Sequence, residues 1–115
     1  MSDGSTVAAL TEPEQLYELL DPDVMWYSVD VDSNYTCNGS DDAIACIQRA
    51  LDAGITGRFE VLGEREGFVV VRPVTNPPRP DPQMCQLMRF RDGLIVEMRD
   101  FADARSALGY AGIGA

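Results

Sequence analysis

The chain of 115 residues contains no histidine and no lysine, so all nine of its basic side chains are arginines. Without histidine, the Ser-His-Asp triad, the Cys-His dyad and every histidine-ligated metal site are excluded within one chain. Without lysine, Schiff-base chemistry is excluded as well. Proton transfer must therefore come from Asp, Glu, Tyr or Cys, with Arg as a cation that does not titrate. We accordingly expect no metal and no cofactor.

Cationic side chains are also few, because the nine arginines stand against nineteen acidic residues and the net charge is −10. A surface of this sign repels phosphate backbones and anionic lipids, so we expect no nucleic-acid partner and no membrane partner. No run approaches the roughly 20 apolar residues of a membrane span, and the N-terminal segment lacks the basic region of a signal peptide. The three cysteines show no CxxC spacing, which is typical of reduced thiols and predicts a cytoplasmic protein.

The residue pattern predicts one α+β domain over residues 11–112, preceded by a flexible N-terminus at residues 1–10. The expected order is helix, strand, helix and then four antiparallel strands. The predicted elements are a helix capped by Thr11 and Glu14 that stops at Asp21-Pro22, a strand at Val24–Val29, a helix with Ser40 as its N-cap and closed by Gly54, strands at Arg58–Glu64, Phe68–Val74, Gln83–Arg91 and Leu94–Phe101, and a short helix capped by Asp103.

Asp92-Gly93 is a strong hairpin signal, and a two-residue turn there fixes the register of both flanking strands. In a regular ladder this register places Asp100 beside Cys85, on one face with Leu87 and Met98. A carboxyl group at the end of an apolar strip has its pKa raised by desolvation, which makes Asp100 a candidate acid or base.

Two structural interpretations of Asp100 stay open beside the catalytic one. The carboxylate can form an ion pair with an arginine, and it can cap the last helix. The candidate ion-pair partners are Arg72, Arg99 and Arg105.

Three stretches, LLDPDVMWYS at 19–28, CNGSDDAIACIQRAL at 37–51 and FRDGLIVEMRDFADARSALGYAG at 90–112, resemble the SnoaL-like branch of the nuclear transport factor 2-like superfamily. The resemblance covers about residues 14–112. It implies a cone-shaped single domain in which a strongly curved antiparallel sheet wraps around two to three helices, with a pocket at the wide end. The superfamily includes polyketide cyclases, ketosteroid isomerase, scytalone dehydratase, limonene epoxide hydrolase and many proteins without catalytic activity.

The resemblance also implies roles for individual residues. It places Asp100 in the pocket and Met98 on its wall, and it matches Arg72 to the Arg of an Arg-x-Asp pair whose acid is replaced by Val74 here. Water activation between two carboxylates is therefore not expected, and the histidine of the dehydratases and cyclases is missing. The remaining candidate pocket residues are Trp26, Tyr27, Ser28, Tyr35, Cys85 and Leu87. The long first helix of the superfamily is truncated, so we expect a smaller or more open cavity.

Three functional hypotheses follow. In the first, the protein is an isomerase, cyclase or dehydratase acting on an apolar carbonyl compound, with Asp100 as acid or base and Arg72 stabilising the developing anion. In the second, the same pocket belongs to a non-catalytic ligand-binding or dimerisation module, and in the third the chain is an adaptor that docks a protein on its exposed sheet face. The resemblance implies a homodimer through that face, which the regular register builds from Met84, Gln86, Met88, Glu97, Arg99 and Phe101.

Overall fold

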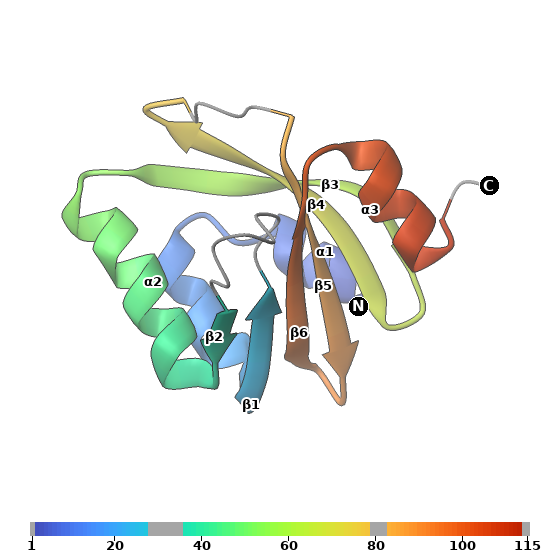
Figure 1. Cartoon of the computed structure of the whole chain (residues 1–115), viewed down its shortest axis with the longest axis horizontal. Helices are drawn as coiled ribbons and strands as arrows, with labels where there is room; N and C mark the ends of the chain where they lie inside the picture. The colour runs from blue at the N-terminus through green and yellow to red at the C-terminus, as the bar shows by residue number, and fades with distance from the viewer. Residues whose placement is uncertain (1, 28–35, 79–82, 114–115) are drawn as a thin grey trace.

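A six-stranded sheet forms the frame of the computed structural model, which describes residues 2–27, 36–78 and 83–113 (Figure 1). The elements in chain order are helix α1 (Asp3–Ala8), 3₁₀ helix η1 (Pro13–Leu19), strands β1 (Leu20–Tyr27) and β2 (Thr36–Asn38), helix α2 (Ser40–Asp52), strands β3 (Thr56–Arg65), β4 (Phe68–Asn76), β5 (Cys85–Arg91) and β6 (Leu94–Phe101), and helix α3 (Ala104–Ala111). The strand order is β2-β1-β6-β5-β4-β3, and every neighbouring pair is antiparallel except β1 with β6. The predicted α+β class is confirmed, and the sheet is antiparallel as predicted except for the β1–β6 pair.

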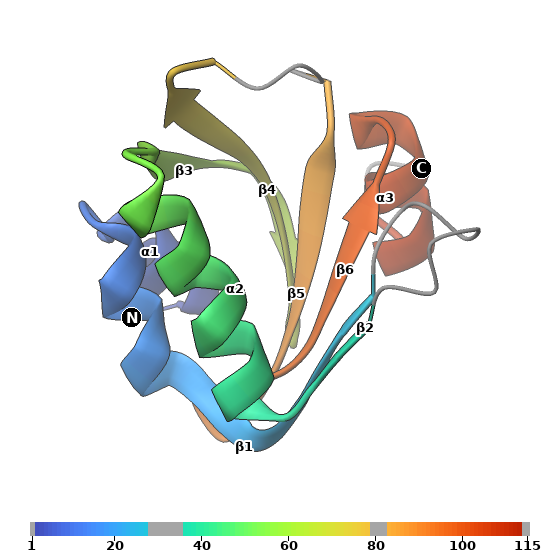
Figure 2. The ribbon, with the colours of Figure 1, turned by 60° about the vertical axis from the view of Figure 1, so that its left-hand side comes forward.

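The sheet is strongly curved, with α2 and η1 on its concave side and α3 against the opposite, convex side (Figure 2). Each side buries its own apolar cluster. The larger one, the concave cluster, joins α1, η1 and α2 to strand residues of the concave side such as Val71, Met88 and Ile95. The smaller one, the convex cluster, joins α3 to Val70 and Leu87. Among the described residues, no helix has the length and apolarity needed to span a membrane.

Helix α2 follows the prediction closely, because its apolar residues recur at helical spacing and bury Ile47 against the sheet. Asp41 and Asp42 lie in its first turn, where negative charge is favoured by the helix dipole. The residue at the N-cap is Gly39 rather than Ser40. Gly54 has a φ of 84° just after the helix, which is the left-handed conformation expected of a terminating glycine.

The N-terminal segment requires a correction, since residues 3–8, expected to be flexible, form helix α1. The side chain of Ser2 caps this helix by accepting a hydrogen bond from the Ser5 amide. The Gly4 amide donates to the Glu64 carboxylate on β3 over 3.1 Å, and Val7 is fully buried. These contacts join residues about 60 positions apart, so the local composition of the segment does not reveal them.

The first predicted helix is a 3₁₀ helix with a different cap. Gln15, rather than Glu14, completes the capping box, and its Oε1 accepts hydrogen bonds from the amides of Glu12 and Thr11. Strand β1 begins at Leu20, which is earlier than predicted, and its partner β2 was not predicted.

The β5–β6 hairpin confirms the predicted turn but not the predicted register. Arg91 pairs with Leu94 and Phe90 with Ile95, but Arg89 then pairs with Glu97. Val96 is therefore an extra residue, a β-bulge that shifts every later pair by one position. The bulge places both Ile95 and Met98 in the concave cluster, although they are three residues apart.

This shift divides the sheet face that was expected to form a dimer. Gln86 and Met88 are buried, with Met88 in the concave cluster. Phe101 packs in the convex cluster, and Met84 is buried. The predicted surface is therefore not one continuous face.

Candidate ligand-binding site

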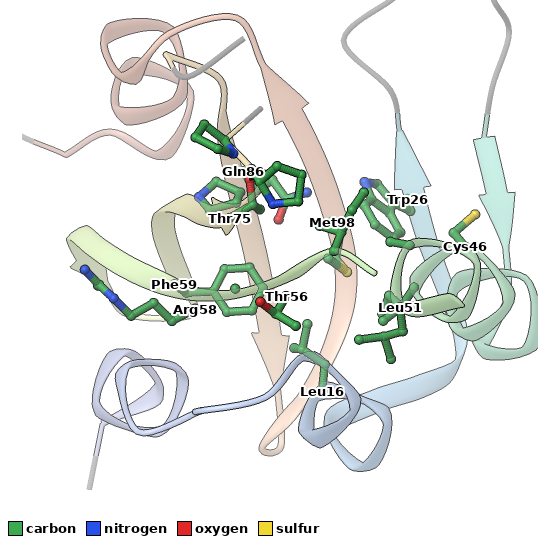
Figure 3. Close-up of a pocket in the computed structure, with 17 residues that line it drawn as sticks. Leu16, Trp26, Cys46, Leu51, Thr56, Arg58, Phe59, Thr75, Gln86 and Met98 are labelled. Atoms are coloured by element: carbon green, nitrogen blue, oxygen red, sulfur yellow. Dashed lines mark hydrogen bonds between the residues drawn. The ribbon is translucent and has the colours of Figure 1, made fainter. Parts of the chain in front are cut away.

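A cavity of about 580 Å³ lies between α2 and the concave side of the sheet (Figure 3). Its volume falls within the range of small-molecule sites, roughly 300–1,000 Å³. The lining residues come from η1, α2, five strands and the segments after α2 and β4. They are Leu16, Trp26, Cys46, Ile47, Ala50, Leu51, Ile55, Thr56, Gly57, Arg58, Phe59, Pro73, Thr75, Pro77, Pro78, Gln86 and Met98.

Two periodicities build this wall. Cys46, Ile47, Ala50 and Leu51 of α2 share one face, because residues three or four positions apart lie together on a helix. On the facing strand β3, Phe59 packs against the apolar cluster of the concave side together with Val61, two residues further on. Alternate residues of a strand share one face, so this face of β3 points to the cavity. Figure 3 shows Leu51 and Phe59 on opposite sides of the space, with Trp26 and Met98 along the sheet.

The lining is mostly apolar. Among the described lining residues, Arg58 alone has a charged side chain, and Arg58 is exposed. The Thr75 hydroxyl already donates to the carbonyl oxygen of Pro77 over 3.0 Å. Gln86, which is 5% exposed, is the polar side chain most deeply set in the wall.

A hydrogen-bonded cluster of three side chains lies at the sheet end of the cavity. The indole Nε1 of Trp26 donates to Asp100 Oδ1 over 2.9 Å, and Gln86 Nε2 donates to the same oxygen over 3.1 Å. The strands explain this meeting, because β6 lies between β1 and β5 and the observed register sets Asp100 opposite Gln86. Trp26 and Gln86 line the cavity directly, and Asp100 connects them.

The structure brings together part of the predicted site. Trp26 and Met98 line the cavity, and Asp100 contacts its wall through Trp26 and Gln86. Ser28 and Tyr35 lie outside the described residues.

The prediction that Cys85 and Leu87 line the pocket is corrected, because both side chains are fully buried in the convex cluster with α3. The bulge at Val96 is the reason, since it turns Met98 and Asp100 away from the face that holds Cys85. Burial raises the pKa of the Cys85 thiol, and the nearby Arg72 guanidinium lowers it by a smaller amount.

The prediction that Arg72 belongs to the site is corrected as well. Arg72 follows Val71, which faces the concave cluster, so it lies on the convex side of β4. Its guanidinium is 3.8 Å from the carboxylate of Glu60, and Arg72 is not among the residues that line the cavity.

Tyr27 also lies outside the cavity. The Arg99 guanidinium is 4.4 Å from the centroid of its ring and 5.0 Å from that of Tyr110, which is a cation–π arrangement on the convex side. Arg99 Nε donates to Glu97 Oε2 over 3.1 Å. The last helix is capped by Asp103, as predicted, because its carboxylate accepts a hydrogen bond from the Ser106 amide. The same hydrogen bond lowers the pKa of Asp103.

Gln86, Phe59 and Pro73 line the cavity but were not predicted as site residues from the sequence. The regular register assigned Gln86 to the opposite face of the sheet. Phe59 and Pro73 lie within predicted strands, and a strand pattern does not by itself indicate a cavity. A signal was present in β6, because Ile95 and Met98 cannot share one face of a regular strand. Within the described ranges, no group of three His, Cys, Asp or Glu side chains is placed to hold a metal ion.

Comparison with known proteins identifies the fold. No protein-family model matches the chain, and no curated protein sequence matches it. Among solved structures, IdmH of Streptomyces antibioticus, a candidate polyketide cyclase, is 20% identical with a TM-score of 0.65, covering 98% of this chain and 100% of that one. A nuclear transport factor 2-like protein of unknown function from Cytophaga hutchinsonii is 14% identical with a TM-score of 0.64, covering 85% and 94%.

A third structure carries a small molecule. A protein with a ketosteroid isomerase-like fold from Catenulispora acidiphila, solved with trimethylamine, is 18% identical with a TM-score of 0.56, covering 96% of this chain and 89% of that one. The chain therefore has the nuclear transport factor 2-like fold that SnoaL-like and ketosteroid isomerase-like proteins share. At these identities the likeness concerns the fold alone.

Proposed function

We propose that this protein binds a small apolar molecule in the cavity between α2 and the sheet. The observation that carries the proposal is the apolar, partly enclosed space of about 580 Å³ with few polar groups at its wall. Such a composition is typical of small-molecule sites, in which apolar walls supply affinity and a few polar groups fix orientation. The fold neighbours agree with a small-molecule ligand in general, since one is a candidate polyketide cyclase and another was solved with trimethylamine.

Binding of a neutral fluorescent dye tests the proposal. N-phenyl-1-naphthylamine fluoresces strongly in apolar surroundings, so its emission should rise and saturate when it enters the cavity. The change Ala50→Phe places a ring in the lining and should weaken dye binding at least about tenfold. Its matched control is Ala45→Phe on the exposed side of α2, which should bind the dye like the parent protein. Equal binding by both variants would contradict the proposal.

A second candidate function is acid–base chemistry on an apolar carbonyl compound, with Asp100 as the base. The observation that favours it is the position of the Asp100 carboxylate, which accepts hydrogen bonds from two residues of the cavity wall, Trp26 and Gln86. Arg72 is not part of this proposal, because it pairs with Glu60 on the convex side. The base would have to reach a carbon-bound proton of the ligand past Trp26 and Gln86.

Hydrogen exchange at the carbon next to a ketone separates the two functions. If Asp100 is a base, the protein should accelerate deuterium uptake into the methyl group of 2-acetonaphthone in heavy water, and Asp100→Asn should abolish the acceleration. If the protein only binds ligands, it should leave the exchange rate unchanged while still binding the ketone. One-dimensional NMR follows both the exchange and the binding.

A further inference from the structure

The carboxamide of Gln86 is held in one orientation by Asp100. Its Nε2 lies 3.1 Å from Asp100 Oδ1. An ionised carboxylate can only accept hydrogen bonds, so the amide must present its NH₂ group to Asp100 and its Oε1 elsewhere. The assignment of nitrogen and oxygen in this side chain therefore follows from the chemistry of its neighbour.

This orientation leaves an acceptor at the cavity wall. Gln86 is 5% exposed and lines the cavity, and no residue in the ranges 2–27, 36–78 and 83–113 donates a hydrogen bond to its Oε1. Buried polar atoms are almost always hydrogen-bonded in native proteins, because an unsatisfied one costs free energy. A ligand group that donates a hydrogen bond would satisfy this oxygen.

Gln86 is the most deeply buried side-chain acceptor of the described cavity wall. The Trp26 indole N–H is already directed to Asp100, so Trp26 offers the cavity its aromatic surface. The hydroxyl oxygens of Thr56 and Thr75 can also accept a hydrogen bond. Thr56 is exposed, however, and Thr75 is half-buried and directs its proton to Pro77. The wall therefore combines an apolar surface with one acceptor that is both buried and held in a fixed orientation.

The donor should be neutral. None of the described lining residues is an Asp or Glu, so an ammonium group entering the cavity would lose its hydration without a carboxylate at the wall. A hydroxyl group needs one acceptor and carries no charge, which matches the single oxygen of Gln86.

We propose that Gln86 selects ligands that carry a neutral hydroxyl group on an apolar body, and that Asp100 is the positioning residue that keeps its oxygen turned to the cavity. This inference rests on the binding function proposed above and deepens it. It requires no chemical step. Asp100 acts here through Gln86 and Trp26 rather than through direct contact with the ligand.

Three naphthalene derivatives of similar size test the selection. 2-Naphthol donates a hydrogen bond, while 2-methoxynaphthalene and 2-acetonaphthone can only accept. Dissociation constants follow from the shift of the indole N–H signal in ¹⁵N-resolved NMR, which is a single signal because Trp26 is the only tryptophan of the chain. We expect 2-naphthol to bind at least about tenfold more tightly than either acceptor-only compound.

Two variants locate the origin of this preference. Gln86→Met removes both polar atoms at nearly constant volume and should reduce the preference for 2-naphthol to within about twofold. Its matched control, Gln48→Met, changes an exposed glutamine of α2 outside the cavity and should keep the full preference. Asp100→Asn gives Gln86 a neighbour that can donate as well as accept, so its amide can turn and 2-acetonaphthone should gain affinity relative to 2-naphthol.

The outcomes separate the two proposals. If the three compounds bind the parent protein equally well, the hydroxyl selection is overturned and the binding function stands. If none of them binds, the binding function fails and the selection fails with it. A preference that survives both Gln86→Met and Asp100→Asn would assign the selection to another group and overturn the inference. Should Gln86→Met fail to fold, the parent protein and Asp100→Asn still decide between these results.

Discussion

At the scale of single residues, Asp100 organises the wall of the cavity. Its Oδ1 accepts hydrogen bonds from Trp26 on one neighbouring strand and Gln86 on the other. The sequence could indicate Asp100 as a candidate, because the predicted register places this carboxylate at the end of an apolar strip. Its partners could not be predicted, since they depend on a register that a single extra residue changed.

Replacing Asp100 by Leu should lower the free energy of unfolding by about 1–3 kcal/mol, because two partly buried donors would lose their acceptor. Asp100→Asn retains an acceptor oxygen and should cost less. Urea unfolding followed by the fluorescence of Trp26 measures both changes. A Leu variant as stable as the parent protein would show that these hydrogen bonds do not stabilise the fold.

Cys85 makes a prediction about alkaline pH. Burial raises the pKa of its thiol above the ordinary value of 9.0, so the folded protein keeps a proton that the unfolded chain loses. The free energy of unfolding should therefore fall as the pH rises through 9.0 and towards the pKa of the folded state. Urea unfolding of the parent protein and of Cys85→Ala at about pH 7.5 and 9.5 measures this. The variant, although less stable, should show a smaller loss between the two pH values, and equal losses would contradict the prediction.

At the scale of elements, sequence signals predicted those helices and turns correctly whose structure depends on contacts between residues close in the chain. The turn at Asp92-Gly93, the amphipathic helix α2 and the cap at Asp103 depend on residues close in sequence, and the structure has all three. Helix α1 depends on Glu64, far along the chain, and local composition could not reveal it. The bulge at Val96 depends on which side chains the concave cluster accepts.

The Asp103 cap gives a prediction about acidic pH. Its hydrogen bond with the Ser106 amide lowers the pKa of the carboxylate below 3.8, so the stabilisation is present above this value and is lost as the pH falls through the lowered pKa. Asp103→Ala should therefore lower the melting temperature near neutral pH and have a smaller effect at about pH 2.5.

Asp103→Asn is the matched control, because asparagine keeps the capping acceptor but does not titrate. Its melting temperature should lie nearer that of the parent protein than that of Asp103→Ala at neutral pH. An alanine variant that melts like the parent protein at both pH values would contradict the assigned role of the cap.

At the scale of the whole molecule, the curved sheet separates two environments. The concave side holds the cavity, and the convex side holds α3 and the pair of aromatic rings around Arg99. The fold class was predictable because the hydrophobic pattern and the resemblance agreed. Which residues face the cavity was predictable only in part, since Cys85, Leu87, Tyr27 and Arg72 lie on strands whose inward face depends on the full topology.

Self-association remains a prediction at this scale. We still expect a homodimer, but the sheet face predicted for it is divided by the bulge, so the surface must be another one. Tyr110 of α3, which is 52% exposed, is the candidate contact. Light scattering at micromolar concentration should then give a mass about twice the 12.6 kDa of one chain. Tyr110→Arg should shift the mass towards the monomer, and a monomeric parent protein would remove the expectation.

The contacts of a bound probe show whether the concave cavity holds an apolar ligand. Isotope-filtered NMR of the complex with N-phenyl-1-naphthylamine reports which protein methyl groups lie within about 5 Å of the dye. We expect contacts to the methyl groups of Leu51 and Met98, which line the cavity from α2 and from strand β6. Contacts confined to convex residues such as Leu108, with none to Leu51 or Met98, would contradict this expectation.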